Sequence, residues 1–424
     1  MTLIRTSLLN GIAVVIKMLT LLGINKILAV YVGPAGYAAL GQFQNAVQMI
    51  TTFASGAINT GVTKYTAEYH ADETLQHQVW STAGSIALIG SIITAAVIAY
   101  FNECLAGWFL KDTQYGGVFI WFAATLVFFV FNALLLAILN GKKEVGRYVL
   151  ANIAGSIFAF VITVAMSVSM KLYGALIALA IYQSVSFFVT FLLVVRAPWF
   201  KVAYLFGSID WKIAKKLAKY TAMALTSAAC VPVSHILIRN YLGEHIGWGA
   251  AGYWEAMWRL SSAYLMLVTT TLGIYYLPRL AELTCAREIR QEIFQGYKLI
   301  LPTVIVGAAA IYLLRDFIVQ MLFSAEFYAM RDLFAWQLLG DILRIGSWII
   351  AYLMLSKAMF KPFMITEVIF AASFYFLSVM LSQWFGIEGI VIAYAINYLI
   401  YWIVIYLVIF RSVANKSTNS ELFR

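Results

Sequence analysis

The chain has 424 residues, of which 63% are hydrophobic and 11% charged, with a formal net charge of +10 and a mean hydropathy of +0.86. These values exclude a soluble globular domain and are typical of an integral membrane protein. The 3 cysteines are too few for a disulfide framework, and neither Cys-x-x-Cys nor a His and Cys cluster is present, so we predict no metal site and no cofactor.

Apolar windows follow one another along the chain, separated by turn residues and charges. Each is long enough for a helix that crosses a bilayer, which needs about 20 residues. A β-barrel is excluded because its strands alternate polar and apolar residues over segments of about ten, whereas these windows are continuously apolar. The 12 predicted spans are 8–32, 37–62, 79–101, 117–140, 148–170, 172–195, 219–241, 250–278, 298–322, 333–355, 362–383 and 387–410.

The positions of the 29 Lys and Arg residues predict the orientation of these spans. If both termini are cytoplasmic, 20 of them fall in inner loops and tails and 4 inside predicted helices, and the outer segments hold 5, namely Lys111, Lys171, Arg239, Arg315 and Arg331. Cytoplasmic loops of membrane proteins carry such an excess of cations. The positive charge is therefore interpreted as a topology signal, and no nucleic-acid partner is predicted.

The longest loop precedes the seventh predicted span and contains SIDWKIAKKLAKY at residues 208–220. Its apolar residues fall on one helical face and its lysines on the other, which predicts an amphipathic helix on the inner membrane surface. A solvated charged linker is the plainer alternative. The predicted domains are an N-terminal six-helix lobe over 1–196, this linker over 197–218, and a C-terminal six-helix lobe with a short cytoplasmic tail over 219–424.

An internal repeat supports this division. GPAGY at 33–37 recurs as GAAGY at 249–253, KYTAE at 64–68 resembles RLAE at 279–282, and LKDTQY at 110–115 resembles FSAEFY at 323–328. The offsets are 216, 215 and 213 residues, in the same order along both halves. The sequence thus predicts an all-α polytopic membrane protein with two parallel-repeat six-helix lobes around a central cavity, an arrangement in which transporters bind substrate near the midplane.

Charged residues inside the predicted spans point to the contents of that cavity. Asp341 and Arg344 lie near the middle of span 333–355, where each charge costs roughly 2.5–3.5 kcal/mol unless it faces the protein interior. Lys26, Arg259 and Asp341 are predicted at a similar depth, roughly 9–14 Å below the outer surface. Lys17, Lys26, Arg259 and Arg344 outnumber the acidic Glu255 and Asp341 by two. A cavity with excess cations suits an anion such as phosphate.

Uncharged polar residues add to the predicted site. The second span carries a stripe of amides suited to sugar hydroxyls, formed by Gln42, Gln44, Asn45 and Gln48. Trp254 in the eighth span is a candidate for stacking on sugar faces. Pro232 interrupts the seventh span beside Ser234 and His235, and a proline there favours a bend that suits a moving gate.

Each of these residues also has a purely structural interpretation. Asp341 and Arg344 are three residues apart and would neutralise each other as a structural ion pair, whereas Lys26 would extend to the lipid headgroups. Gln42 and Gln44 would join helices through hydrogen bonds. His235 would be a packing residue rather than a proton relay.

Several motifs resemble the bacterial lipid-linked oligosaccharide flippases, the O-antigen and enterobacterial common antigen translocases of the multidrug/oligosaccharidyl-lipid/polysaccharide exporter superfamily. These motifs are GPAG at 33–36, GVTKYTAEYH at 61–70, LLRDF at 313–317 and AMRDLFAWQLLGDILRIG at 329–346. The resemblance spans most of the chain and is densest over 20–78 and 270–370.

The resemblance implies transport of an undecaprenyl-diphosphate-linked oligosaccharide between the leaflets of the bacterial inner membrane, for O-antigen or related polysaccharides. Lys26, Arg259 and Arg344 would then bind the diphosphate, and Asp341 would couple transport to protons or sodium ions. Membrane lipids, a polysaccharide polymerase and a chain-length regulator are the implied partners. A cation-coupled multidrug exporter of the same superfamily is the alternative, and a polysaccharide polymerase is a weaker one because no loop is long enough for a catalytic domain.

Overall fold

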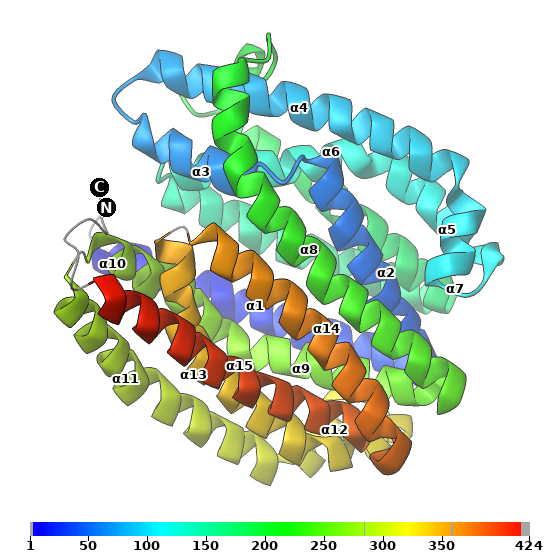
Figure 1. The fold of residues 1–424 in the computed structure, drawn as a ribbon. Helices are drawn as coiled ribbons and strands as arrows, with labels where there is room; N and C mark the ends of the chain where they lie inside the picture. The colour runs from blue at the N-terminus through cyan, green and yellow to red at the C-terminus, as the bar shows by residue number, and fades with distance from the viewer. Residues whose placement is uncertain (1–2, 284, 358, 417–424) are drawn as a thin grey trace. The chain divides into compact units, whose positions relative to one another are not determined.

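The computed structural model describes residues 3–283, 285–357 and 359–416 and contains helices and no strands over these ranges (Figure 1). The predicted tail beyond residue 416 lies outside the described residues. The α-helices are α1 (Leu3–Tyr31), α2 (Gly33–Ala54), α3 (Asn59–Glu68), α4 (Glu73–Tyr100), α5 (Asn102–Phe109), α6 (Gly116–Gly141), α7 (Val145–Val195), α8 (Trp211–His245), α9 (Trp248–Thr271), α10 (Leu277–Glu282), α11 (Ala286–Leu313), α12 (Arg315–Leu322), α13 (Phe334–Ser356), α14 (Phe360–Phe385) and α15 (Glu388–Lys416). Short 3-10 turns η1 (Thr113–Tyr115), η2 (Val202–Leu205) and η4 (Ala325–Leu333) and one π-helical turn, η3 (Leu272–Tyr276), join them.

Over the described residues, 8 helical segments are long and apolar enough to cross a membrane. One of them, α7, has 51 residues and contains a break at Lys171 (φ 50°, ψ −129°), so it accommodates the two predicted spans 148–170 and 172–195. Three predicted spans, 37–62, 219–241 and 250–278, do not coincide with any of these apolar segments; they correspond to α2, α8 and α9. Helix α2 carries the predicted amides, α9 carries Glu255 and Arg259, and α8 carries His235 and Arg239, and these polar residues lower the hydropathy of the three helices.

The predicted span 37–62 is wrong at its C-terminal end. Helix α2 stops at Ala54, and the chain turns before α3 begins at Asn59. Gly56 and Ala57 both adopt positive φ values, of 62° and 52°, which end a right-handed helix. This end was hard to predict because alanine rarely adopts such a conformation.

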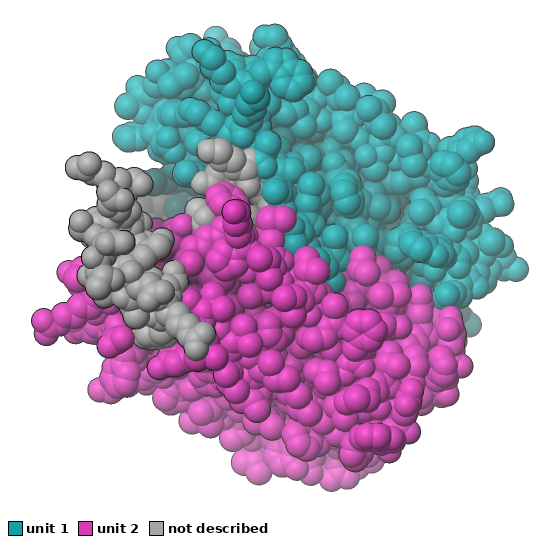
Figure 2. Space-filling model, in the orientation of Figure 1, with its two compact units in different colours: residues 1–32, 39–232 teal, residues 33–38, 233–424 magenta. Residues whose placement is uncertain are grey.

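The chain forms two compact units, coloured separately in Figure 2. Unit 1 comprises residues 1–32 and 39–232, and unit 2 comprises residues 33–38 and 233–424. The division falls at Pro232, inside the continuous helix α8. The lobe boundaries inferred from the repeat stay a prediction.

In unit 1, helix α6 packs against α3, α4 and α7, and α7 also packs against α1. Edge-to-face contacts of Phe43 on α2 with Phe119 and Phe122 on α6, at centroid distances of 5.3 and 6.3 Å, lie in its core. At Gly84, an added Cβ would lie 2.0 Å from the carbonyl oxygen of Leu205, so only glycine lets the connecting segment approach α4 this closely.

The segment predicted to form an amphipathic helix on the membrane surface is helical and forms the start of α8. Its apolar residues Ile213 and Leu217 are 6% and 0% exposed, so they pack against protein. Lys216 Nζ donates a hydrogen bond to the Tyr69 hydroxyl at 2.8 Å, which raises the pKa of the Lys216 ammonium. Two residues of the predicted apolar face therefore pack against protein, and the position of this segment at the inner membrane surface stays a prediction.

In unit 2, helix α13 packs against α9, α10, α11, α14 and α15. Its core side chains include Ile345, Ile349 and Ile350, each at most 1% exposed. Neighbouring helices also bond to its backbone: Tyr297 OH donates to the Gly346 carbonyl at 2.7 Å. Helix α13 is thus fixed on several sides, and it carries Asp341 and Arg344.

The two copies of the repeated GxAGY motif contact each other in unit 2. An added Cβ on Gly252 would lie 1.8 Å from the Pro34 carbonyl oxygen, so the second copy needs glycine at this contact. Tyr37 from the first copy and Tyr253 from the second both pack edge-on against Phe327, with centroids 5.0 and 6.0 Å away. The repeat recognised in the sequence therefore corresponds to a packed contact between α2 and α9.

Candidate functional site

A buried group of two arginines and one glutamate joins α8 to α9. Glu255 Oε2 accepts from Arg239 Nη2 at 2.6 Å and from Arg239 Nε at 3.1 Å, while Glu255 Oε1 accepts from Arg259 Nε at 2.7 Å. The side chains of Arg239, Glu255 and Arg259 are 2%, 3% and 13% exposed. Glu255 and Arg259 meet because they stand one turn apart on the same helix face. One carboxylate therefore serves two guanidinium groups, and the group as a whole carries one positive charge.

Aromatic rings cover both arginines of this group. The guanidinium of Arg239 lies 5.4 Å from the Trp254 ring, and that of Arg259 lies 5.6 Å from the Tyr37 ring. Such cation–π contacts stabilise cations most where water is excluded. Trp254 itself is 1% exposed. In this conformation the indole contacts protein, and its predicted role on sugar faces stays a prediction.

Asp341 on α13 is fully buried, and hydroxyl groups from two other helices hold it. Its Oδ2 accepts hydrogen bonds from the Ser261 hydroxyl at 2.7 Å and from the Tyr264 hydroxyl, both on α9. Its Oδ1 accepts from the Tyr394 hydroxyl on α15 at 2.8 Å. Gln337 Nε2 donates to Ser261 at 3.1 Å and extends the network. A carboxylate with three donors is stabilised without a cation in direct contact.

Arg344 lies one turn further along α13, between aromatic rings. Its guanidinium is 5.1 Å from the Trp258 ring and 4.4 Å from the Trp348 ring. Its Nη1 donates a long hydrogen bond of 3.5 Å to Tyr394 OH, and its buried Nε atom has no hydrogen-bond partner. Within the described part of the chain, no carboxylate oxygen forms an ion pair with Arg344. This guanidinium can therefore accept an anion without first releasing a carboxylate.

The structure shows how Asp341 and Arg344 lie relative to each other, while their roles in transport stay a prediction. They do not form a direct ion pair; the Tyr394 hydroxyl lies between them and bonds to both. A change of charge or position at Asp341 would act on Arg344 through this hydroxyl. His235, in contrast, packs in an aromatic cluster against Trp254 and Trp258 with centroids 5.2 and 4.3 Å away, as the packing interpretation predicted.

The remaining predicted site residues lie in unit 1 or at its edge. Lys26 is half-buried on α1, Gln42 on α2 is fully buried, and Asn45 is half-buried with an Nδ2 atom that has no hydrogen-bond partner. Gln44 and Gln48 are exposed. The amide stripe therefore points partly into the core of unit 1. Convergence of these residues with Arg259, Asp341 and Arg344 stays a prediction.

Arg239 and Glu367 were missed at the sequence level. Arg239 was assigned to an outer segment, yet it is 1% exposed inside α8. Its spacing of four residues from His235 is the signal that would have placed it on the interior face. Glu367 lies half-buried on α14. Adding Arg239 and Glu367 to the predicted charge count adds one positive and one negative charge, so the excess of two positive charges is unchanged. Within unit 2, the three arginines of this count are balanced by three carboxylates, namely Glu255, Asp341 and Glu367.

Over the described residues, no group of three or more His, Cys, Asp or Glu side chains is arranged to hold a metal ion. The site residues described above supply guanidinium, carboxylate, hydroxyl and aromatic groups. Such groups are able to bind charged ligands, and among the described residues the Arg344 guanidinium forms no ion pair with a carboxylate.

Comparison with known proteins gives matches along most of the chain. The model of a family described as polysaccharide biosynthesis protein matches residues 3–284. Proteins named lipid III flippase from Escherichia coli (strain K12) and Shigella flexneri are each 31% identical over 409 residues, which cover 95% of this chain and 97% of theirs.

Solved structures resemble the fold. An inward-facing MATE family transporter of the MOP superfamily matches with a TM-score of 0.77 and 15% identity, over 95% of this chain and 96% of that chain. The lipid II flippase MurJ, in an inward closed conformation, matches with a TM-score of 0.71 and 12% identity, over 96% of this chain and 87% of that chain. These structures confirm the predicted fold class, a two-lobed bundle of membrane helices.

Proposed function

The chain belongs to the family of polysaccharide biosynthesis proteins, and from this premise we propose that it is a flippase for lipid-linked oligosaccharides. The proposed substrate is an undecaprenyl-diphosphate-linked oligosaccharide that moves from the cytoplasmic to the periplasmic leaflet of the bacterial inner membrane. The product would supply the assembly of O-antigen or a related surface polysaccharide. In this orientation both termini are cytoplasmic.

One observation carries the proposal: the 31% identity to lipid III flippases extends over 95% of the chain. It therefore includes both units and the helices that hold the buried charges. The resemblance to lipid-linked oligosaccharide flippases seen in the sequence motifs is confirmed by these relatives. Their name denotes a transport activity, so the chain is grouped with transporters and not with enzymes.

Arg344 is the proposed primary contact for the diphosphate. A guanidinium is planar and binds phosphate oxygens through two parallel hydrogen bonds. The Nε atom of Arg344 has no hydrogen-bond partner, and the rings of Trp258 and Trp348 hold the guanidinium in place. A phosphate oxygen would satisfy this buried donor, whose desolvation otherwise costs free energy.

Arg259 is the proposed second contact, with an affinity set by Glu255. In the present conformation Glu255 already accepts a hydrogen bond from Arg259, so a diphosphate must compete with this carboxylate. Arg239 remains bound to the same carboxylate through two hydrogen bonds. This sharing favours reversible binding, since Glu255 would take back Arg259 when the substrate leaves. Lys26 and the amides Gln42, Gln44, Asn45 and Gln48 are proposed to contribute from unit 1.

Asp341 is the proposed coupling group. Protonation would remove its charge and reorganise the hydroxyls of Ser261, Tyr264 and Tyr394. Because Tyr394 also bonds to Arg344, the anion-binding guanidinium would respond to the same event. A sodium ion bound at the carboxylate would act in the same direction by neutralising its charge.

Pro232 is the proposed hinge for alternating access. The boundary between the two compact units falls at this residue, and α8 continues through it. A proline inside a helix removes one backbone hydrogen bond and weakens the helix at that position. Motion of one unit against the other would therefore meet little resistance here.

A cation-coupled drug exporter is the second candidate because MATE transporters share the fold. At 15% identity that likeness concerns the fold alone. An exporter of cationic drugs would be favoured if the chain raised drug resistance in a susceptible strain without moving lipid-linked saccharides. A polymerase would be favoured if its loss left lipid-linked units in the outer leaflet without longer polymers.

Complementation tests the proposal in a strain that lacks its own flippase for the same glycan. Arg344→Ala is expected to lower the translocation rate about 10-fold to 150-fold, which corresponds to about 1.5–3 kcal/mol for a hydrogen bond to a charged group. Arg315→Ala is the matched control, since the Nη1 of Arg315 already donates to the Tyr312 carbonyl three residues earlier in the chain. Full translocation by Arg344→Ala, at equal protein levels, would remove Arg344 from substrate binding.

A further inference from the structure

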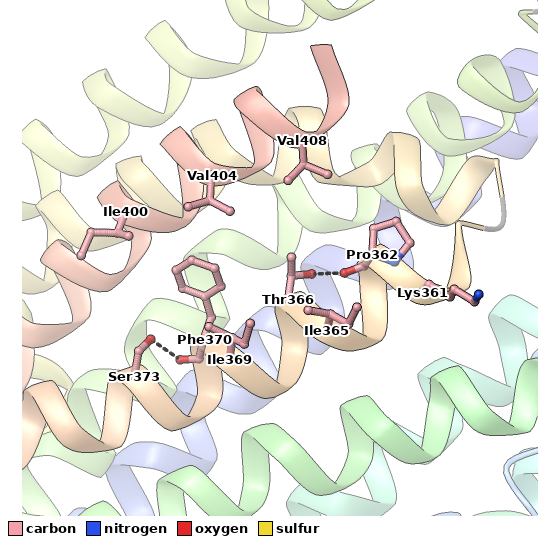
Figure 3. A pocket seen from close by; sticks show the side chains of 10 residues that line it. All are labelled: Lys361, Pro362, Ile365, Thr366, Ile369, Phe370, Ser373, Ile400, Val404 and Val408. Carbon is pink, nitrogen blue, oxygen red and sulfur yellow. Dashed lines mark hydrogen bonds between the residues drawn. The ribbon is translucent and has the colours of Figure 1, made fainter. Parts of the chain in front are cut away.

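A groove of about 640 Å³ runs between α14 and α15 in unit 2 (Figure 3). Its wall on α14 extends from Lys361 to Ser373, and its wall on α15 from Ile400 to Val408. Twelve residue steps along α14 correspond to about 18 Å at about 1.5 Å per residue. This length is close to the hydrocarbon depth of one leaflet, which is about half of the ~30 Å core. The lining residues are Lys361, Pro362, Ile365, Thr366, Ile369, Phe370, Ser373, Ile400, Val404 and Val408.

The groove presents an apolar surface although it contains two hydroxyl side chains. Thr366 Oγ1 donates to the Pro362 carbonyl of its own helix at 2.9 Å, as Figure 3 shows. Ser373 Oγ donates to Asn397 Oδ1 at 2.5 Å and approaches the Phe370 carbonyl at 3.2 Å. Both hydroxyls are thus satisfied within the protein. A ligand in the groove meets methyl groups, methylene groups and the Phe370 ring.

One end of the groove is cationic. Lys361 is exposed and is the charged residue among those that line the groove (Figure 3). Helix α14 begins at Phe360, so the positive end of its dipole lies at the same end. The distribution of cations along the chain predicts that this end faces the cytoplasm. A matching ligand has an anionic head at the inner membrane surface and an apolar chain that extends toward the midplane.

We propose that this groove binds the polyprenyl chain of the lipid-linked substrate, with the phosphate beside Lys361, before the headgroup enters the transport site. The inference rests on the proposed flippase function and adds a tail-binding site to it. A polyprenyl phosphate has one chain, which suits a single groove between two helices. Glycerophospholipids have two chains under one phosphate, and one of them would remain outside.

Packing and charge must supply the selectivity of this site. Lipid chains are as apolar as the groove, so entry of a chain from the bilayer gives little hydrophobic free energy. The branched side chains Ile365, Ile369 and Val404 instead offer dispersion contacts to the methyl branches of a polyprenyl chain. Lys361 adds attraction to the phosphate that corresponds to about fivefold in affinity, the value for one lysine near an anionic headgroup.

Photocrosslinking tests the proposal on the full chain in phosphatidylethanolamine nanodiscs. The probe is undecaprenyl phosphate with a diazirine in its tail, and crosslinked peptides are located by mass spectrometry. Ile369→Trp places a bulky ring in the groove, whereas Val368→Trp is a matched control, because Val368 is 52% exposed on the same helix and does not line the groove. Lys361→Gln tests the charge.

We expect crosslinks within residues 361–373 and 400–408 that unlabelled undecaprenyl phosphate removes and an equal excess of phosphatidylglycerol does not. Ile369→Trp should abolish them, Val368→Trp should leave them unchanged, and Lys361→Gln should weaken probe binding about fivefold. Crosslinks spread over the whole lipid-facing surface, equal competition by phosphatidylglycerol, or full labelling of Ile369→Trp would each overturn the proposal.

Transport by the same proteins separates this inference from the proposed function. If the groove is wrong and the function right, Ile369→Trp moves lipid-linked saccharide at the rate of Val368→Trp in proteoliposomes. If the function is wrong, the unaltered protein moves none, whatever the crosslinking shows. Thermal unfolding of both tryptophan variants establishes that each is folded before either result is used.

Discussion

Removal of Glu255 should leave two arginines without their shared carboxylate. In the Glu255→Ala variant, Arg239 remains 2% exposed and cannot reach water, whereas Arg259 is 13% exposed and more able to adjust. Breaking a buried ion pair by deleting one partner costs about 3–5 kcal/mol. We therefore expect the free energy of unfolding to fall by about 3–5 kcal/mol, dominated by Arg239.

The measurement is the free energy of unfolding in detergent micelles under titration with a denaturing detergent. The double variant Arg239→Met, Glu255→Ala removes both buried charges and should recover most of the loss. The control is Asp316→Ala, because Asp316 pairs with Arg331 at 2.6 Å but both side chains are well exposed, at 53% and 35%. Its cost should stay below about 1 kcal/mol. The reasoning would be refuted if Glu255→Ala and Asp316→Ala lowered the free energy of unfolding by the same amount. It would also be refuted if the loss in the double variant equalled the sum of the losses measured for Arg239→Met and Glu255→Ala separately.

Two further predictions concern coupling and helix contact. Asp341→Asn should keep the fold, because an amide still hydrogen-bonds to the surrounding hydroxyls. The variant should make transport in proteoliposomes insensitive to imposed proton or sodium gradients. An unchanged dependence of the transport rate on these gradients would exclude a coupling role for Asp341. Gly252→Ala should lower the thermal unfolding temperature, because its Cβ would lie 1.8 Å from the Pro34 carbonyl oxygen. Gly249→Ala is the control and should leave this temperature unchanged, because no atom lies within 4 Å of its added Cβ. Equal unfolding temperatures for the two variants would contradict the importance of this close approach.

Long apolar windows and the cost of buried charge were sufficient to predict much of the fold. The break between two membrane spans near Lys171 follows from hydropathy alone, and the structure has it inside α7. The interior placement of Asp341 and Arg344 follows from the cost of exposing a charge to lipid. Both features depend on properties of one segment at a time.

Interactions between distant segments could not be predicted in the same way. The Tyr394 hydroxyl that lies between Asp341 and Arg344 belongs to α15. Tyr394 is 53 residues from Asp341 and 50 residues from Arg344 along the chain. Arg239 was assigned to an outer segment because a hydropathy window does not reveal the carboxylate of Glu255 on the next helix. Partners of this kind depend on tertiary packing, which spacing along one helix does not determine.

The proposed flippase activity is tested most directly by transport of a defined undecaprenyl-diphosphate-linked oligosaccharide in proteoliposomes that contain the purified chain. The saccharide is placed in one leaflet, and its arrival in the other is measured with and without proton or sodium gradients, for the unaltered protein and for Arg344→Ala. We expect transfer by the unaltered protein and a loss of about 10-fold or more in the variant. No transfer by the unaltered protein under any gradient, or equal transfer by both proteins, would contradict the proposed function and the role of Arg344 in it.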